Sequence, residues 1–188
     1  LQNAAEDTNF IAVVVPTTYA IGVKRITVTL AGTAVTASMF AEGFVIITLG
    51  TGLGYQYKIR AHDVQTSTTG ALTIDLEDAL VVALDTTSRV CLKKNPYHGV
   101  IVAPYATPTG AMVGVAVYPI TASYYGWLQV GGLCPVLCDA TTFAVGDMVG
   151  MSDATDGAAM TATLAGGKLG VALSTGTSAY FRPVLLSI

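Results

Sequence analysis

Apolar and polar residues alternate with a period of two along much of this 188-residue chain. In the segments 25–30 and 55–60, aliphatic or aromatic residues alternate with charged residues, threonine or glutamine. Such alternation is typical of strands with one buried and one wet face. The first half of the chain is therefore expected to contain six strands, at 10–15, 24–30, 43–49, 55–62, 71–76 and 89–93.

Helix signals are nearly absent, because valine, threonine, glycine and tyrosine favour strands and turns over helices. The one segment with a plausible helical pattern is 76–84, LEDALVVAL. The same segment also fits a pair of short strands joined through a bulge.

The second half of the chain contains an internal repeat. The stretch 113–130 reads as a β-hairpin with arms at 113–117 and 124–130, and a similar stretch follows 56 positions later at 169–186. The identical residues in the two copies are Gly114 and Gly170, Val115 and Val171, Ala116 and Ala172, Thr121 and Thr177, and Tyr124 and Tyr180. A repeated supersecondary unit explains this agreement. Further strands are expected at 99–104 and 148–151.

The predicted boundary within the chain is the Asn-Pro turn in the segment 93–99, KKNPYHG. It divides the chain into an N-terminal β lobe, 1–95, and a C-terminal β lobe, 96–188, built on the repeated hairpin. The expected fold class is all-β, a barrel or jelly-roll-like sandwich of two β lobes with almost no helix.

The balance of charge and hydrophobicity predicts contact with other protein. Hydrophobic residues make up 52% of the chain and charged residues 11%, against about 25% in ordinary soluble domains. The mean hydropathy is +0.60, yet no apolar run approaches the ~20 residues that cross a membrane. No membrane partner is expected, and the apolar surface is expected to be covered in an assembly.

Nucleic acid is not an expected partner. The net charge is −3, and nine basic residues spread along the chain form no phosphate-binding stripe. The N-terminal sequence LQNAAEDTNF also lacks the basic start and apolar run of a signal peptide.

Three cysteines, an odd number, do not form a disulfide framework and fit a reducing compartment. Cys134 and Cys138 lie four residues apart, with His98 and Asp139 as conceivable further zinc ligands. A structural zinc site needs a second ligand pair at close spacing, and the sequence offers none. We expect the cysteines to fill the core, and no metal is predicted.

Two acidic groups have alternative interpretations. Asp153 and Asp156 resemble a fragment of a calcium loop without its closing glutamate, and capping of a turn explains both. Asp75, Glu77 and Asp78 could contain a pair of glycosidase carboxylates, but a solvated strand edge is the preferred interpretation.

No catalytic site or cofactor site is predicted. The chain has two histidines, His62 and His98, and no G-x-S-x-G motif. The glycines at 50, 52 and 54 do not have dinucleotide-binding spacing and indicate a hairpin turn.

The most informative aromatic residues are Tyr124, Tyr125 and Trp127 in the first hairpin. On a strand, Tyr125 and Trp127 share one face and Tyr124 lies on the other. A core position for Trp127 is the first expectation. A subunit interface, where tryptophan and tyrosine concentrate binding energy, is the second. A platform that stacks on sugars is the third.

The residues from this hairpin onward resemble structural proteins of tailed bacteriophage virions, often head decoration or cement proteins. The similarity rests on the stretch 113–132, centred on Tyr125-Gly126-Trp127-Leu128-Gln129. It continues through the motifs at 144–149 and 169–172, and more loosely upstream through YKIRAHDV and KNPYHGVIVAP.

This resemblance implies a non-enzymatic β protein that sits on the capsid surface of a virion assembled in the host cytoplasm. It implies the major capsid protein as partner, a homotrimer at local three-fold positions, and no catalytic residues. The chain is larger than the smallest decoration proteins, so a receptor- or carbohydrate-binding module of a spike or tail fibre is the alternative. A small hydrolase is a third class, which would need a cleft that holds a perturbed acid or base.

Overall fold

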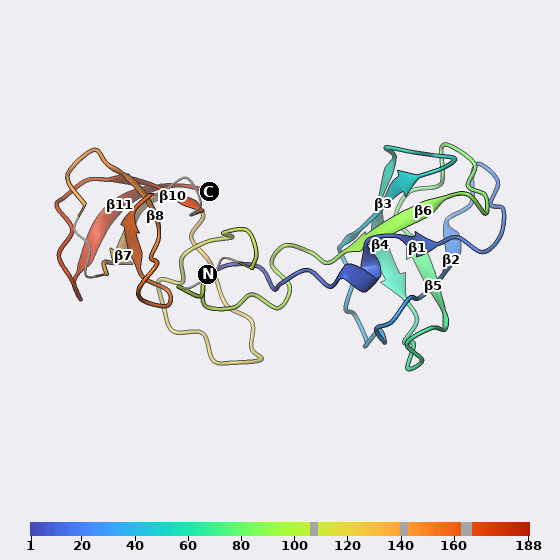
Figure 1. Ribbon diagram of the computed structural model, residues 1–188, viewed down its shortest axis with the longest axis horizontal. Helices are drawn as coiled ribbons and strands as arrows, with labels where there is room; N and C mark the ends of the chain where they lie inside the picture. Colours follow the sequence, from blue (N-terminus) through green and yellow to red (C-terminus); the bar gives the residue numbers. More distant parts are fainter. Residues whose placement is uncertain (106–108, 140–142, 163–166) are drawn as a thin grey trace. The chain divides into compact units, whose positions relative to one another are not determined.

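The computed structural model describes residues 1–105, 109–139, 143–162 and 167–188 (Figure 1). These residues form strands and loops, and the single helical element among them is the short 3-10 helix η1, Thr8–Phe10. The chain divides into two compact units, one formed by Asp7–His98 and the other by Leu1–Glu6 together with Gly99–Ile188. The predicted all-β class is confirmed.

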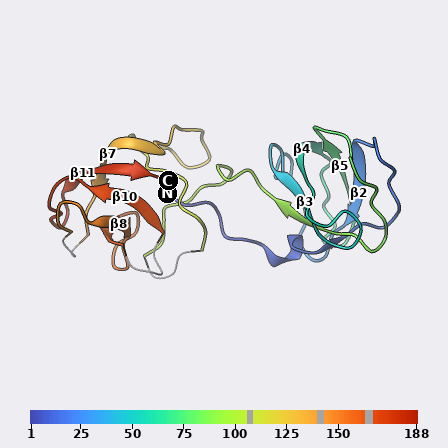
Figure 2. The same ribbon diagram turned by 90° about the horizontal axis from the view of Figure 1, so that it is seen from above.

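Residues Asp7–His98 form a closed antiparallel barrel (Figures 1 and 2). Its strands follow the order β1-β2-β5-β4-β3-β6. Their bounds are β1 Val13–Val14, β2 Arg25–Thr29, β3 Phe44–Leu49, β4 Gln56–His62, β5 Ala71–Leu76 and β6 Arg89–Lys93. Strands β3, β4 and β5 are neighbours in sequence and in space, and β6 returns to lie beside β3, which is a Greek key. All six strands lie within the ranges predicted from the alternation.

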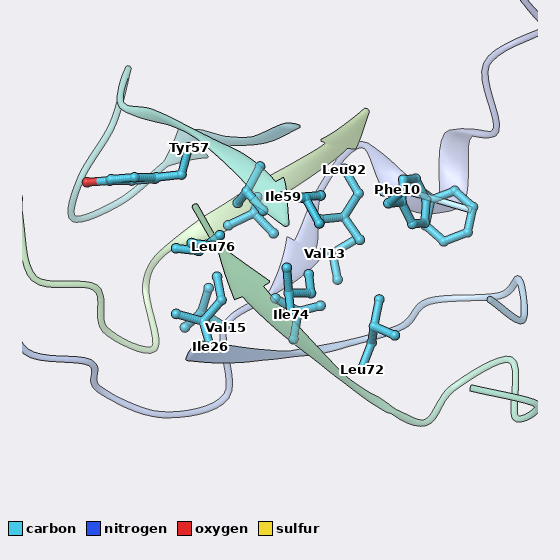
Figure 3. Packing of buried hydrophobic residues seen from close by; sticks show 14 of the residues in the cluster. Phe10, Val13, Val15, Ile26, Tyr57, Ile59, Leu72, Ile74, Leu76 and Leu92 are labelled. Atoms are coloured by element: carbon cyan, nitrogen blue, oxygen red, sulfur yellow. The ribbon is translucent and has the colours of Figure 1, made fainter. Parts of the chain in front are cut away.

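The interior of the barrel is filled by the aliphatic half of each alternating strand (Figure 3). Ile26 and Val28 of β2 and Leu72 and Ile74 of β5 are fully buried, while the residues between them are half-buried or exposed. Each such side chain contributes about 1.5–3 kcal/mol through removal from water. Because the sheet closes on itself, the barrel has no long unpaired strand edge.

The outer face of the barrel carries a cross-strand ion pair. Arg25 lies opposite Asp75 in the β2–β5 register, and its Nε and Nη2 donate to the two carboxylate oxygens at 2.7 and 2.9 Å. This hydrogen bond lowers the pKa of Asp75. The predicted strand-edge location of Asp75 is wrong, because β5 lies between β2 and β4. Glu77 and Asp78 are exposed.

The segment 76–84 is not a helix. It runs as an irregular segment, with bends at 77–78 and 81–82, beside residues 19–23. Leu80 exchanges backbone hydrogen bonds there with Gly22 and Val23, and Leu84 with Tyr19. Leu80 and Leu84 are both buried in the barrel core. Their spacing of four residues suits one face of a helix, but pairing with the 19–23 loop buries the same two side chains.

The second unit contains a five-stranded antiparallel sheet in the order β7-β11-β10-β8-β9. The bounds are β7 Gly131–Leu137, β8 Met148–Met151, β9 Ala159–Thr161, β10 Lys168–Ala172 and β11 Phe181–Ser187. A parallel bridge between Cys138 and Ala159 links the two ends of the sheet. The predicted strand at 148–151 is confirmed, whereas 99–104 forms only a bridge, between Ile101 and Gln2. The sequence did not indicate β7 or β9.

The first residues of the chain belong to this second unit, unlike the expected division at 95/96. Gln2 is fully buried and forms antiparallel β-bridges with both Ile101 and Met112. The Leu1 nitrogen donates to the Gly114 oxygen at 2.7 Å. The chain therefore passes between the units twice, near residues 6/7 and 98/99.

The buried position of Ile74 leads to a first prediction. Ile74→Ala is expected to lower the free energy of unfolding of the barrel by about 2–5 kcal/mol, through lost apolar contact and a residual cavity. Chemical denaturation followed by circular dichroism measures the change. The control Ile21→Ala, at an exposed position, is expected to change stability by less than about 0.5 kcal/mol. Equal effects of the two substitutions would contradict the assigned core.

Asp85 leads to a pH prediction. Its carboxylate accepts hydrogen bonds from the Thr51 hydroxyl and from the backbone and hydroxyl of Thr87. These bonds, that from Thr51 foremost, lower the pKa of Asp85 below its ordinary 3.8. The stabilisation is complete above pH 3.8 and is lost as the pH falls through the lowered value.

Asp85→Asn is therefore expected to lower the melting temperature of the barrel at pH 7, and the difference from wild type should shrink under strongly acidic conditions. Thermal unfolding measured at several pH values tests this. Asp78→Asn, an exposed substitution of the same type, serves as the control. A difference that does not depend on pH would show that the charge of Asp85 is not involved.

Candidate interaction surface

The sequence repeat is also a structural repeat. In the first hairpin, residues 113–130, the Tyr124 N–H donates to the Thr121 oxygen at 3.1 Å. In the second, residues 169–186, the Tyr180 N–H donates to the Thr177 oxygen at 3.2 Å. The residue before each tyrosine has a positive φ, +66° at Ser123 and +61° at Ala179. Both turns thus adopt the same uncommon backbone conformation.

The arms of the two hairpins also pair in the same register. Val115 lies opposite Gln129, and the equivalent residues Val171 and Leu185 lie opposite each other. Before each valine stands a glycine, Gly114 with φ +152° and Gly170 with φ +159°. A Cβ at Gly114 would lie 2.8 Å from the Leu128 Cβ, and one at Gly170 would collide with the Leu185 carbonyl. Glycine is required in both copies because the opposite arm approaches so closely.

The surroundings of the two copies differ. In the second hairpin, β10 pairs with β8 and β11 pairs with β7 along its whole length. In the first hairpin, the described residues form one bridge, Val115–Gln129, and no regular strand. The predicted strands at 113–117 and 124–130 are therefore wrong as regular strands. Among the described residues, only isolated backbone hydrogen bonds flank this hairpin, between Leu1 and residues 113–114 and between Ile188 and Val130, where the second hairpin has complete strands.

The first hairpin carries a group of exposed aromatic side chains, Tyr118, Tyr124, Tyr125 and Trp127, called here the aromatic cluster. Tyr125 is fully exposed and Trp127 is 94% exposed. The expected core position of Trp127 is wrong, because no strand lies over this part of the hairpin. In Figure 1 the hairpin is the yellow-green to yellow loop that extends away from the strands of its unit.

A shallow hollow of about 320 Å³ lies within the aromatic cluster. Its lining includes the four aromatic residues together with Ile120 and Thr121. Ile120 lies across the hairpin against Gly126, where an added Cβ would come within 2.5 Å of the Ile120 side chain. The glycine between Tyr125 and Trp127 thus lets Ile120 fill the space between the two arms.

The aromatic cluster lies in a part of the chain that has no charge. Residues 99–138 contain no Asp, Glu, Lys or Arg, although both ends of the chain outside them do. This signal can be read from the sequence, and it marks the exposed hairpin more sharply than the aromatic residues alone. An uncharged, aromatic surface fits contact with apolar protein or with the ring of a sugar.

The cysteines are core side chains. Cys134 and Cys138 are buried in the core of the sheet, and burial raises the pKa of both thiols. Asp139, also buried, accepts a hydrogen bond from the Ser152 hydroxyl at 2.6 Å. His98 belongs to the barrel unit and is exposed. Within the described residues, no three His, Cys, Asp or Glu side chains lie close enough together to hold a metal ion.

The turn that contains Asp153 is held by its neighbour Ser152. The Ser152 hydroxyl accepts hydrogen bonds from the backbone N–H groups of Ala154 and Thr155. Asp156 caps a different segment, because its carboxylate accepts from the Tyr105 N–H at 2.9 Å. Capping thus explains Asp156, while the expected capping role of Asp153 is performed by a serine.

The chain matches no family model, and it has no significant match to a curated protein or to a solved structure. The described residues include no helix of the length and hydrophobicity needed to cross a membrane.

The equivalent glycines provide a test of the repeat. Gly170→Ala is expected to destabilise the second unit by about 1–3 kcal/mol or more, because the new Cβ meets a carbonyl inside the sheet. Gly114→Ala is expected to reshape the first hairpin with a smaller loss, since no regular strand pairs with it. Thermal unfolding measures stability, and Trp127 fluorescence reports on the hairpin. Equal destabilisation by both substitutions would contradict the different surroundings of the two copies.

Proposed function

We propose that this chain is a non-enzymatic structural subunit of a tailed-bacteriophage virion, most specifically a head decoration or cement protein that binds the major capsid protein. The observation that carries the proposal is the aromatic cluster, held out on an uncharged hairpin of a defined shape. The resemblance of the same hairpin to virion structural proteins points to the same role.

The size of the aromatic cluster supports a protein partner. An aromatic side chain buries about 150–250 Å² when covered, so four of them supply about 600 Å² or more. A standard interface buries about 800 Å² per partner. At about 25 cal/mol per Å², the cluster alone supplies about 15 kcal/mol before the costs of association are subtracted. A surface of this kind is suited to burial in an assembly.

A cement protein acts by adding contacts across joints between capsid subunits. Rupture of the shell then requires that these contacts break as well, and many identical copies make a modest energy per site sufficient. In this role the protein forms a homotrimer at local three-fold positions on the outside of the capsid, after assembly in the host cytoplasm. The closed barrel suits a virion surface, because it offers no free edge for unwanted strand pairing.

Binding to shells provides the test. Trp127→Ala and Tyr125→Ala are each expected to weaken binding to shells of the major capsid protein by about thirtyfold, the effect of losing a 2 kcal/mol hot spot. Co-sedimentation with shells assembled without this chain measures the affinity. Because both side chains are exposed, circular dichroism and the melting temperature should not change.

Phe181→Ala is the matched control, since Phe181 is the exposed equivalent of Tyr125 in the second hairpin. It is expected to bind shells as wild type does. Absence of shell binding by the wild-type protein would overturn the proposal. Light scattering of the free protein should give about three times 19.3 kDa if the trimer forms before attachment.

The hollow within the aromatic cluster favours a second candidate function, the binding of a carbohydrate receptor by a spike or tail-fibre module. Aromatic rings stack on the apolar faces of sugars, and the hydroxyls of Thr121 and the tyrosines can bond to sugar hydroxyls. A glycan array with wild-type protein and Trp127→Ala separates the two functions. A specific glycan signal that is lost in the variant would favour this candidate over the capsid role.

A further inference from the structure

We infer that the first hairpin is a strand-addition site, in which an extended, uncharged segment of the major capsid protein pairs with the outer edge of residues 124–128. The inference rests on the proposed function and names the mode of contact. It derives from the internal repeat, because the second hairpin shows what covers the equivalent edge when the ladder is complete.

On its outer edge the arm carries unpaired hydrogen-bonding groups as far as Leu128, whereas the Val130 carbonyl beyond it accepts from the Ile188 N–H at 3.3 Å. Gln129 exchanges both of its backbone hydrogen bonds with Val115, so its groups point to the inner edge. Backbone groups alternate in direction along an extended chain, so those of Gly126 and Leu128 point to the outer edge. Within the described residues, neither Gly126 nor Leu128 forms a backbone hydrogen bond.

In the second hairpin the same positions are paired. The equivalents of Gly126 and Leu128 are Arg182 and Val184 of β11, which lie opposite Val136 and Cys134 of β7. Strand β7 is antiparallel to β11 and covers it from Phe181 to Ser187. An antiparallel strand from a partner would therefore give the first hairpin the neighbour that its copy already has.

The chemistry of the occupant follows from the same comparison. Strands β7, GGLCPVL, and β8, MVGM, which flank the second hairpin, contain no charged residue. The receiving arm has none either, so a charged partner strand would lose hydration here without an opposite charge. Tyr125 and Trp127 share one face of the arm and would contact alternate side chains of the added strand, which provides specificity beyond the backbone pairing.

Hydrogen exchange with and without shells tests the inference directly. The fragment that contains Gly126 and Leu128 is expected to exchange rapidly in the free protein. On binding to shells of the major capsid protein, its exchange is expected to slow by at least about tenfold. The corresponding fragment of β11 is expected to exchange slowly in both states, because β7 already covers it.

A pair of variants at Leu128 separates backbone pairing from side-chain contact. Leu128→Pro removes the outward N–H, and proline is tolerated in an edge strand whose N–H faces solvent. Leu128→Ala retains the N–H and removes the side chain. Leu128→Pro is expected to bind shells about tenfold more weakly than Leu128→Ala, with equal melting temperatures for the two variants.

The outcomes distinguish this inference from the proposed function. Shell binding without slowed exchange at 124–128, or equal affinity of the two Leu128 variants, overturns strand addition and leaves the capsid role standing. Slow exchange of this fragment in the free protein, together with an oligomeric mass by light scattering, would mean that a second copy of the chain covers the edge. That result also overturns strand addition by the capsid protein. If wild-type protein does not bind shells, both proposals fail together.

Discussion

The hydrogen-bonding groups along strand edges are the constraint on which this structure depends. Each strand leaves a row of backbone N–H and C=O groups on both sides, and burial without partners costs free energy. The barrel meets the constraint by closing on itself, and the second unit by joining the ends of its sheet through Cys138 and Ala159. The first hairpin, 113–130, meets it only at its ends, through Leu1 and Ile188, and not at Gly126 and Leu128. Its unpaired edge and its exposed aromatic residues therefore occur together.

The barrel could be predicted from the sequence because local pattern and tertiary environment agree there. The strands that alternate regularly are those whose inner residues, such as Ile26 and Ile74, fill one core. Strand β7 could not be predicted because Gly131, Gly132 and Pro135 argue against a strand. It forms because β11 offers a complete row of partners. The segment 76–84 has the spacing of a helix, but this spacing buries Leu80 and Leu84 from a bent, irregular chain.

The exposed aromatic surface was only partly readable from the sequence. Tyr124, Tyr125 and Trp127 drew attention to this hairpin, but alternation cannot show whether a second layer covers a given face. The repeat could not answer this question, because two similar hairpins have different surroundings. They share turn conformation and register, which local sequence encodes. Their neighbours, which decide exposure, come from distant parts of the chain.

The position of Leu1–Glu6 in the second unit has a consequence for the order of folding. The Leu1 nitrogen bonds to an acceptor 113 residues away, and closing so long a loop in a disordered chain carries an entropic cost. The barrel lies entirely inside that loop, and once folded it holds Asp7 near Thr33 and Lys94. The hydrogen bond with Thr33 foremost, and the charge of Lys94 to a smaller extent, lower the pKa of Asp7. Folding of the barrel thus shortens the effective loop to the stretches 1–6 and 95–113. Residues 1–6 are synthesised before their partners at 101–114. Folding of the barrel between them then brings the two flanks together.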